Sequence, residues 1–105
     1  MIIVFASVYV VVEAIIFVRE LQDIKVSEAK AKVTFECEIS KSGLSVEWYK
    51  GDKKLRRDEK YDIQKDDKVH RLIIDEVVDK DVGEYKAVYK QLSTSAKLTL
   101  AGREH

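Results

Sequence analysis

The segment from Ala31 to Ile39 alternates between apolar and polar side chains without a break. A β-strand places successive side chains on opposite faces, whereas a helix would scatter the same apolar residues around its circumference. One face of such a strand would carry all of its apolar residues: Ala31, Val33, Phe35, Cys37 and Ile39. The segment therefore predicts a strand of an antiparallel sheet, with one buried and one solvated side.

Further short runs with the same period of two follow along the chain, and turn residues separate them. Strands are expected over residues 44–49, 69–75 and 96–100, with another around Tyr85 and Ala87. A weaker run over 61–64 is expected at the edge of a sheet. The pattern predicts an all-β fold built as an antiparallel β-sandwich.

The expected strand over 69–75 leads into an acidic turn that ends at Gly83. Leu72, Ile74 and Val77 should point into the core, whereas His70 is expected on the outward face. The turn contains Asp79 and Asp81, which are typical of tight corners. In this position the two carboxylates are interpreted as turn residues and not as an acid–base pair.

Length and charge limit the classes of function that this chain can have. Its 105 residues are enough for one ordinary domain and leave no room for a second core. Basic and acidic side chains number 19 each, so no net field exists to attract a nucleic acid. We therefore expect no nucleic-acid partner.

The sequence shows no constellation typical of an enzyme or a metal site. It lacks a glycine-rich phosphate loop and paired His or Cys at metal-ligand spacing. The single cysteine and the two histidines lack neighbours that would form a nucleophile and its base. We expect no catalysis, no cofactor, no metal and no small-molecule substrate.

Cys37 is the only cysteine, so no disulfide can form within the chain. Small β domains without a disulfide are typical of reducing compartments, which favours the cytoplasm. Cys37 is expected to act as a small buried apolar residue and not as a reactive thiol. Trp48 follows it by eleven positions on the next expected strand. Trp48 is interpreted as the centre of the core and not as a ligand-stacking residue.

These motifs resemble an I-set immunoglobulin domain over roughly residues 16–101. Cys37 and Trp48 match the cysteine and tryptophan of the immunoglobulin core. The segment 72–77, followed by Asp81-Val82-Gly83-Glu84-Tyr85, resembles the family's E strand and tyrosine corner. The resemblance implies a Greek-key sandwich in which Tyr85 hydrogen-bonds back across the turn before it. It assigns residues 15–101 to the domain and 102–105 to a tail.

The family's second cysteine would stand where this chain has Ala87. The domain must therefore reach its stability by packing alone. Intracellular muscle repeats are similar in lacking one or both cysteines, whereas extracellular receptors and antibodies carry the pair. The expected core centre consists of Cys37, Trp48, Leu72, Tyr85 and Ala87.

Segments 17–23 and 26–28 look like the A and A′ strands of repeats in titin, obscurin and twitchin-type proteins, with titin favoured. This resemblance implies a mechanical and protein-binding module in the cytoplasm, at the sarcomere of the myofibril. Its partners would be neighbouring immunoglobulin or fibronectin-type domains and sarcomeric proteins. Resistance to force would come from hydrogen bonds between segments 25–28 and 95–100. A weaker alternative is a regulatory repeat beside a kinase.

A basic cluster, defined as Lys53, Lys54, Arg56 and Arg57, is the candidate partner surface. It could attract an acidic partner such as an actin surface or a lipid headgroup. Acidic residues at 52, 58 and 59 stand beside it, so a solvated loop is the more common outcome.

Residues 1–14 are almost wholly apolar and leave three alternatives open. They could be an extension or linker without a role in the fold, a signal or membrane anchor, or an added strand or swapped contact with a partner. The signal or anchor alternative would make the chain an exported or membrane-anchored recognition module, with residues 1–18 as the targeting segment. The segment lacks a leading positive charge and carries Glu13, and the unpaired Cys37 fits export poorly. We therefore expect no membrane partner.

Overall fold

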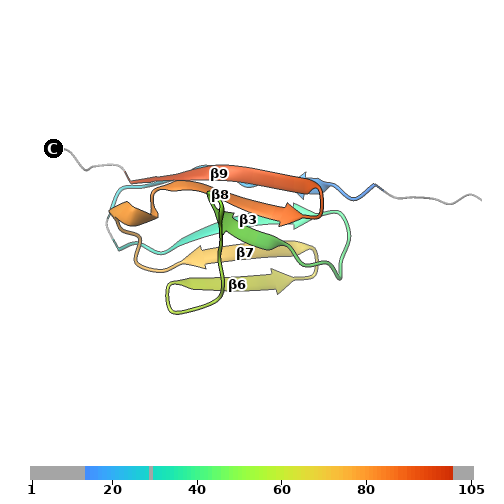
Figure 1. Ribbon diagram of the computed structural model, residues 1–105, viewed down its shortest axis with the longest axis horizontal. Coiled ribbons are helices and arrows are strands. Elements are labelled where there is room, and N and C mark those ends of the chain that lie inside the picture. The colour runs from blue at the N-terminus through green and yellow to red at the C-terminus, as the bar shows by residue number, and fades with distance from the viewer. Residues whose placement is uncertain (1–13, 29, 101–105) are drawn as a thin grey trace, which may run out of the picture.

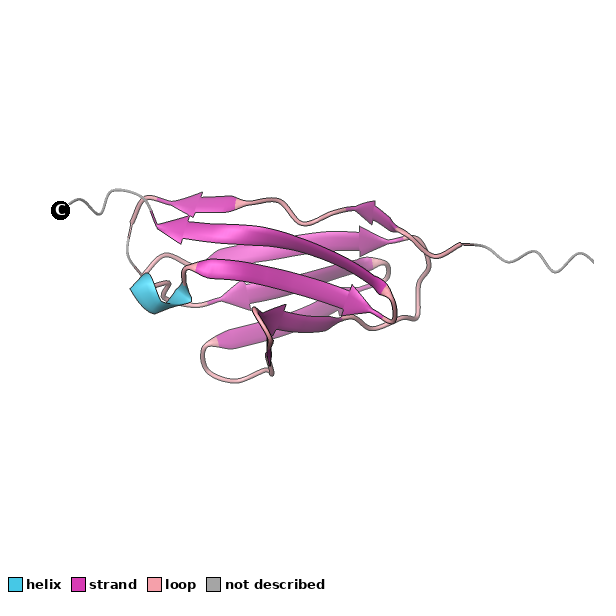
Figure 2. Ribbon diagram, turned by 45° about the horizontal axis from the view of Figure 1, so that its top comes forward, coloured by secondary structure: helices cyan, strands magenta, loops and turns pink. Residues whose placement is uncertain are grey.

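The computed structural model describes residues 14–28 and 30–100. It is a sandwich of two β-sheets that lie face to face (Figures 1 and 2). The apolar segment 1–13 and the tail 102–105, with the alternatives that the sequence leaves open for them, lie outside the described residues. The strands are β1 (Phe17–Arg19), β2 (Ile24–Val26), β3 (Val33–Ile39), β4 (Glu47–Lys50), β5 (Lys53–Lys54), β6 (Tyr61–Asp66), β7 (Val69–Ile74), β8 (Gly83–Tyr89) and β9 (Leu92–Leu100), with a 3-10 turn, η2 (Asp79–Asp81), before β8.

One sheet has the strand order β1-β3-β7-β6 and the other β2-β9-β8-β4-β5. All neighbouring strands are antiparallel except β2 and β9, which run parallel. Strands that follow one another in the chain often lie in different sheets, as a Greek-key sandwich requires. The predicted all-β immunoglobulin-like fold is confirmed.

The alternation that predicts β3 is visible in its burial. Val33, Phe35, Cys37 and Ile39 are buried, and the residues between them are exposed or half-buried. β3 pairs with β7 over six residues, so the apolar faces of both strands cover the same side of the sheet. That face packs against the inner face of the other sheet and forms one continuous core.

The predicted edge strand is confirmed, because β6 lies at the end of its sheet. In the neighbouring charged segment, residues 53, 54 and 56–59 are exposed, as predicted for a solvated loop, and one residue differs. Within it, Leu55 is only 4% exposed, and its N–H donates to the Trp48 carbonyl at 2.8 Å. A single apolar residue among charged ones carries no periodicity, so the sequence pattern does not reveal it.

The prediction that His70 faces outward is wrong. His70 is 2% exposed and alternates in phase with buried Leu72 and Ile74 along β7. The period of two places residues 70, 72 and 74 on one face, so the strand geometry overrides the polarity of the imidazole.

Candidate functional site

The five residues predicted as the core centre lie together between the two sheets. Each of them is at most 1% exposed. Trp48 on β4 pairs in register with Ala87 on β8, and Cys37 and Leu72 come from the opposite sheet. Burial raises the pKa of the Cys37 thiol to about 12, so the thiol stays protonated at neutral pH. A protonated, inaccessible thiol is a poor nucleophile, which leaves Cys37 a packing role.

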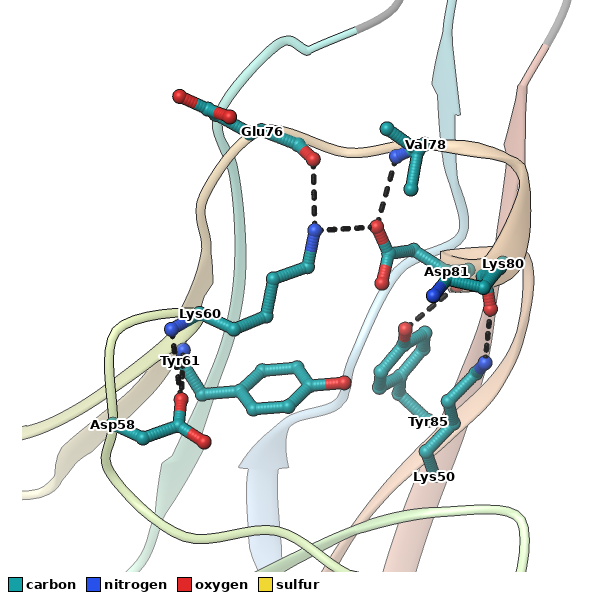
Figure 3. A network of polar contacts seen from close by, with 9 residues as sticks. All are labelled: Lys50, Asp58, Lys60, Tyr61, Glu76, Val78, Lys80, Asp81 and Tyr85. Atoms are coloured by element: carbon teal, nitrogen blue, oxygen red, sulfur yellow. Dashed lines mark hydrogen bonds and ion pairs between the residues drawn. The ribbon is translucent and has the colours of Figure 1, made fainter.

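The tyrosine corner is formed by Tyr85 and the turn before it. The Tyr85 hydroxyl donates a 2.6 Å hydrogen bond to the Asp81 carbonyl, as the family resemblance implies (Figure 3). The Tyr85 ring lies 5.2 Å from the Phe35 ring, centroid to centroid, and so joins the two sheets. Burial raises the pKa of Tyr85, so the phenol remains a donor. This contact fixes η2 against the start of β8.

Asp81 also forms an ion pair with half-buried Lys60, which the sequence pattern does not predict. Its carboxylate is almost fully buried and accepts from the Val78 N–H at 2.8 Å and from Lys60 Nζ at 2.7 Å. Lys60 Nζ also donates to the Glu76 carbonyl at 2.8 Å (Figure 3). The pair ties the loop before β6 to the turn before β8. The only signal in the sequence was a turn aspartate four residues before the corner tyrosine.

The loop that carries Lys60 is itself held by an aspartate. Asp58 Oδ1 accepts from the N–H groups of Lys60 and Tyr61 at 2.8 and 2.9 Å (Figure 3). An aspartate that bonds backbone groups two and three residues ahead stabilises a turn. Lys60 therefore reaches Asp81 from an ordered backbone, which lowers the entropy cost of the ion pair.

The parallel pair of β2 and β9 is the second feature relevant to function. Ile24 pairs with Leu98, and Val26 pairs with Leu100. Two hydrogen bonds from backbone N–H groups to side-chain oxygens also connect the segments that contain β2 and β9. The Leu21 N–H donates to Thr94 Oγ1 at 3.2 Å, and the Lys97 N–H donates to Asp23 Oδ1 at 2.8 Å.

The basic cluster is exposed, and half of its charges are used locally. Lys54 forms an ion pair with Glu47 at 3.2 Å, and Arg57 forms one with Asp62 at 3.5 Å. Exposed pairs of this kind contribute little to stability. Lys53 and Arg56 form no ion pair with any residue that the structure describes. Two of the four cations therefore remain to attract a partner.

Within residues 14–28 and 30–100, no group of His, Cys, Asp or Glu could hold a metal ion. No helix in these residues is long and apolar enough to cross a membrane.

The family model of the immunoglobulin I-set domain matches residues 15–100. The chain belongs to the immunoglobulin I-set family. The I-set domain of this chain resembles cardiac-type myosin-binding protein C of Mus musculus, with 40% identity over 73 residues. That match covers 68% of the chain and only 6% of the relative.

Solved structures of titin domains match the I-set fold of this chain closely. Titin domain I10 has a TM-score of 0.78 at 31% identity, over 85% of this chain and all of that domain. The titin I9–I11 tandem has a TM-score of 0.79 at 31% identity, over 85% of this chain and 34% of the tandem. The chain is an immunoglobulin module of the structural, non-enzymatic kind found in these muscle proteins.

Proposed function

We propose that this I-set domain is a load-bearing and protein-binding module of a sarcomeric scaffold protein. It would act as one domain in a longer chain, in the cytoplasm at the myofibril. Membership of the I-set family and the likeness to myosin-binding protein C and to a titin tandem support this proposal. The domain unit would be residues 15–101, with other domains on either side.

The parallel pairing of β2 with β9 is the observation that carries the mechanical part of the proposal. The described chain begins near one end of the long axis, and β9 ends near the other (Figure 1). A pull on the two ends then loads β2 and β9 in opposite directions along their length. The bonds between them are sheared together and do not open one after another.

Loading in shear matters because one hydrogen bond contributes only about 0.5–1.5 kcal/mol net. A set of bonds that must break at once resists a force that each bond alone would not. The Asp23 and Thr94 side chains add bonds to the same region and therefore to the same barrier.

Single-molecule force spectroscopy on the full chain between handle domains tests the proposal. Proline removes a backbone N–H and is poorly tolerated in a paired strand. Neighbouring N–H groups on a strand point in opposite directions, so either Ile24→Pro or Lys25→Pro must remove a bond to β9. We expect at least one of the two variants to unfold at a clearly lower force than the parent.

Ile63→Pro and Gln64→Pro are the matched controls. They also lie on an edge strand, β6, and have the same half-buried and exposed side chains as Ile24 and Lys25. β6 does not lie between the two loaded strands, so these variants should lower stability in denaturant without lowering the unfolding force equally. Equal loss of force in both pairs would refute the shear geometry.

The protein-binding part of the proposal concerns Lys53 and Arg56, the cations of the basic cluster that have no local partner. An acidic surface on a neighbouring sarcomeric protein would complement them. Replacing both with glutamine should weaken binding to an acidic partner and make it less dependent on salt. Unchanged binding and salt dependence would remove the basic cluster from the interface.

A further inference from the structure

A partly open cleft of about 300 Å³ lies at one side of the sandwich, between the two sheets. Trp48 of β4 and His70 of β7 line its inner part and are almost fully buried. Exposed side chains form its rim, and those that matter are Ser45, Arg57, Gln64 and Lys65.

Two of the residues that line the cleft each carry a buried side-chain nitrogen without a hydrogen bond. Trp48 Nε1 and His70 Nε2 are both buried and have no partner among the described residues. Buried polar groups in proteins are nearly always paired, because an unpaired one loses its hydration without compensation. Two such side chains beside one cleft make it the candidate place for a polar group to bind.

The charge of the cleft indicates which polar group fits. Its lining contains Arg57 and Lys65 and no carboxylate. Asp62 lies just outside the lining and forms an exposed ion pair with Arg57 at 3.5 Å. Lys65 Nζ donates to Ser45 Oγ at 3.1 Å and forms no ion pair with a described residue. The indole N–H of Trp48 can only donate. The cleft therefore offers hydrogen-bond donors and positive charge, which select an anion with several acceptor oxygens.

His70 is a group that can become protonated when such an anion binds. Burial, and then the nearby positive charge of Lys65, lower the pKa of His70, so the ring is neutral near pH 7. The other groups beside it are the protonated Cys37 thiol opposite on β3 and Arg57 at the rim. None of these supplies a negative charge that would stabilise an imidazolium ring before an anion binds. The carboxylate at the rim, Asp62, forms an ion pair with Arg57.

We propose that this cleft is a binding site for a small oxyanion, either a carboxylate or a phosphate group. The anion accepts the Trp48 Nε1–H, and the exposed Lys65 side chain turns toward it. Arg57 joins them by exchanging its exposed pair with Asp62 for the anion. His70 takes up one proton from solvent at Nε2 and donates it to a second oxygen. Both nitrogens are shielded from solvent, so binding requires rim side chains such as Gln64 to move aside. Gln64 is exposed, and its movement breaks the 2.9 Å hydrogen bond from its Nε2 to Asp62 Oδ2.

Trp48 is the only tryptophan in the chain, so one indole N–H signal in a nitrogen–proton NMR spectrum reports on the cleft. The full chain is titrated with sodium phosphate, sodium acetate or sodium chloride at constant ionic strength. We expect a saturable downfield shift of the indole proton, with a dissociation constant of about 1 mM or tighter. Saturation with phosphate identifies a free oxyanion as the ligand, and saturation with acetate a carboxylate of the kind carried by acidic side chains. No saturable shift, or an equal shift with chloride, would overturn the site.

Three variants that each remove one positive charge distinguish anion binding in the cleft from a general effect of surface charge. Lys65→Gln and Arg57→Gln should each weaken anion binding roughly threefold to tenfold. Lys32→Gln removes an exposed lysine that lies outside both the cleft and the basic cluster, so it should leave the affinity unchanged. Proton uptake by His70 predicts tighter binding as the pH falls from 7 toward 6, together with a rise in the NMR pKa of His70. Equal losses in all three variants, or affinity that does not depend on pH, would contradict this assignment.

Discussion

Trp48 pairs in register with Ala87, so the largest side chain of the core lies beside one of the smallest. The two residues face the sheet that carries Cys37. In a disulfide-bonded immunoglobulin domain the bridge would occupy this space, with the tryptophan packed against it. Here the indole and its apolar neighbours must hold the two sheets together without a covalent link.

Trp48→Ala should therefore cost about 3–5 kcal/mol in the free energy of unfolding, or leave the domain unfolded. Trp48 is 1% exposed, and its removal opens a cavity between the sheets that the flanking strands cannot close. Denaturant melts followed by far-UV circular dichroism measure the loss. Trp48→Phe keeps most of the apolar contact and should cost clearly less. A loss below about 1 kcal/mol for the alanine variant would show that Trp48 is not central to stability.

Ala87→Cys should form a disulfide with Cys37 when the purified protein is oxidised. The bridge would close a loop of about 50 residues and raise the free energy of unfolding by roughly 4 kcal/mol on the chain-entropy model. Thiol counting and melts with and without reductant measure both effects. Ala87→Ser adds a side chain of similar size that cannot bridge, so it isolates the cost of overpacking. Two free thiols after oxidation would show that the space beside Trp48 has closed.

The strand pattern of this fold could be predicted from the sequence because burial follows the period of two. The residues of β3 are predicted one by one, and the edge position of β6 follows from its weak apolar content. The polarity of its side chain predicts His70 on the outward face, whereas the alternation along its strand places it inside. Position 70 lies two residues before Leu72, and the phase alone would have placed it inside.

The polar contacts at the end of the sandwich cannot be predicted from the strand pattern. Lys60 and Asp81 are 21 positions apart and meet only because the β6 loop and the turn before β8 lie at the same end of the molecule (Figure 3). Their pairing depends on tertiary structure and on the orientation of two long side chains. The local sequence pattern contains neither kind of information, so it predicts that charged residues in turns are solvated.

Tyr85→Phe should lower the free energy of unfolding by about 1–3 kcal/mol, because the Asp81 carbonyl would lose a buried donor. The phenyl ring keeps the contact with Phe35, so the variant should remain folded and the loss should come from the hydroxyl alone. Urea melts give the value. Tyr89→Phe is the control, since Tyr89 is half-buried and should change stability by less than about 0.5 kcal/mol. Equal effects of the two substitutions would mean that the corner bond adds nothing.

The burial of His70 should make the domain less stable as the pH falls below about 6.5, in the absence of oxyanions. The pKa of His70 is lowered in the folded protein by burial and by Lys65, so the unfolded chain binds a proton that the folded one does not. Stability therefore falls with decreasing pH between the unfolded and the folded pKa, at up to about 1.4 kcal/mol per pH unit. Urea melts in an anion-poor buffer between pH 7.5 and pH 5 would follow this loss. His70→Gln should flatten the profile in that window. If parent and variant have the same slope, or if NMR gives His70 an ordinary pKa, the imidazole is solvated and the cleft is open to water down to Trp48.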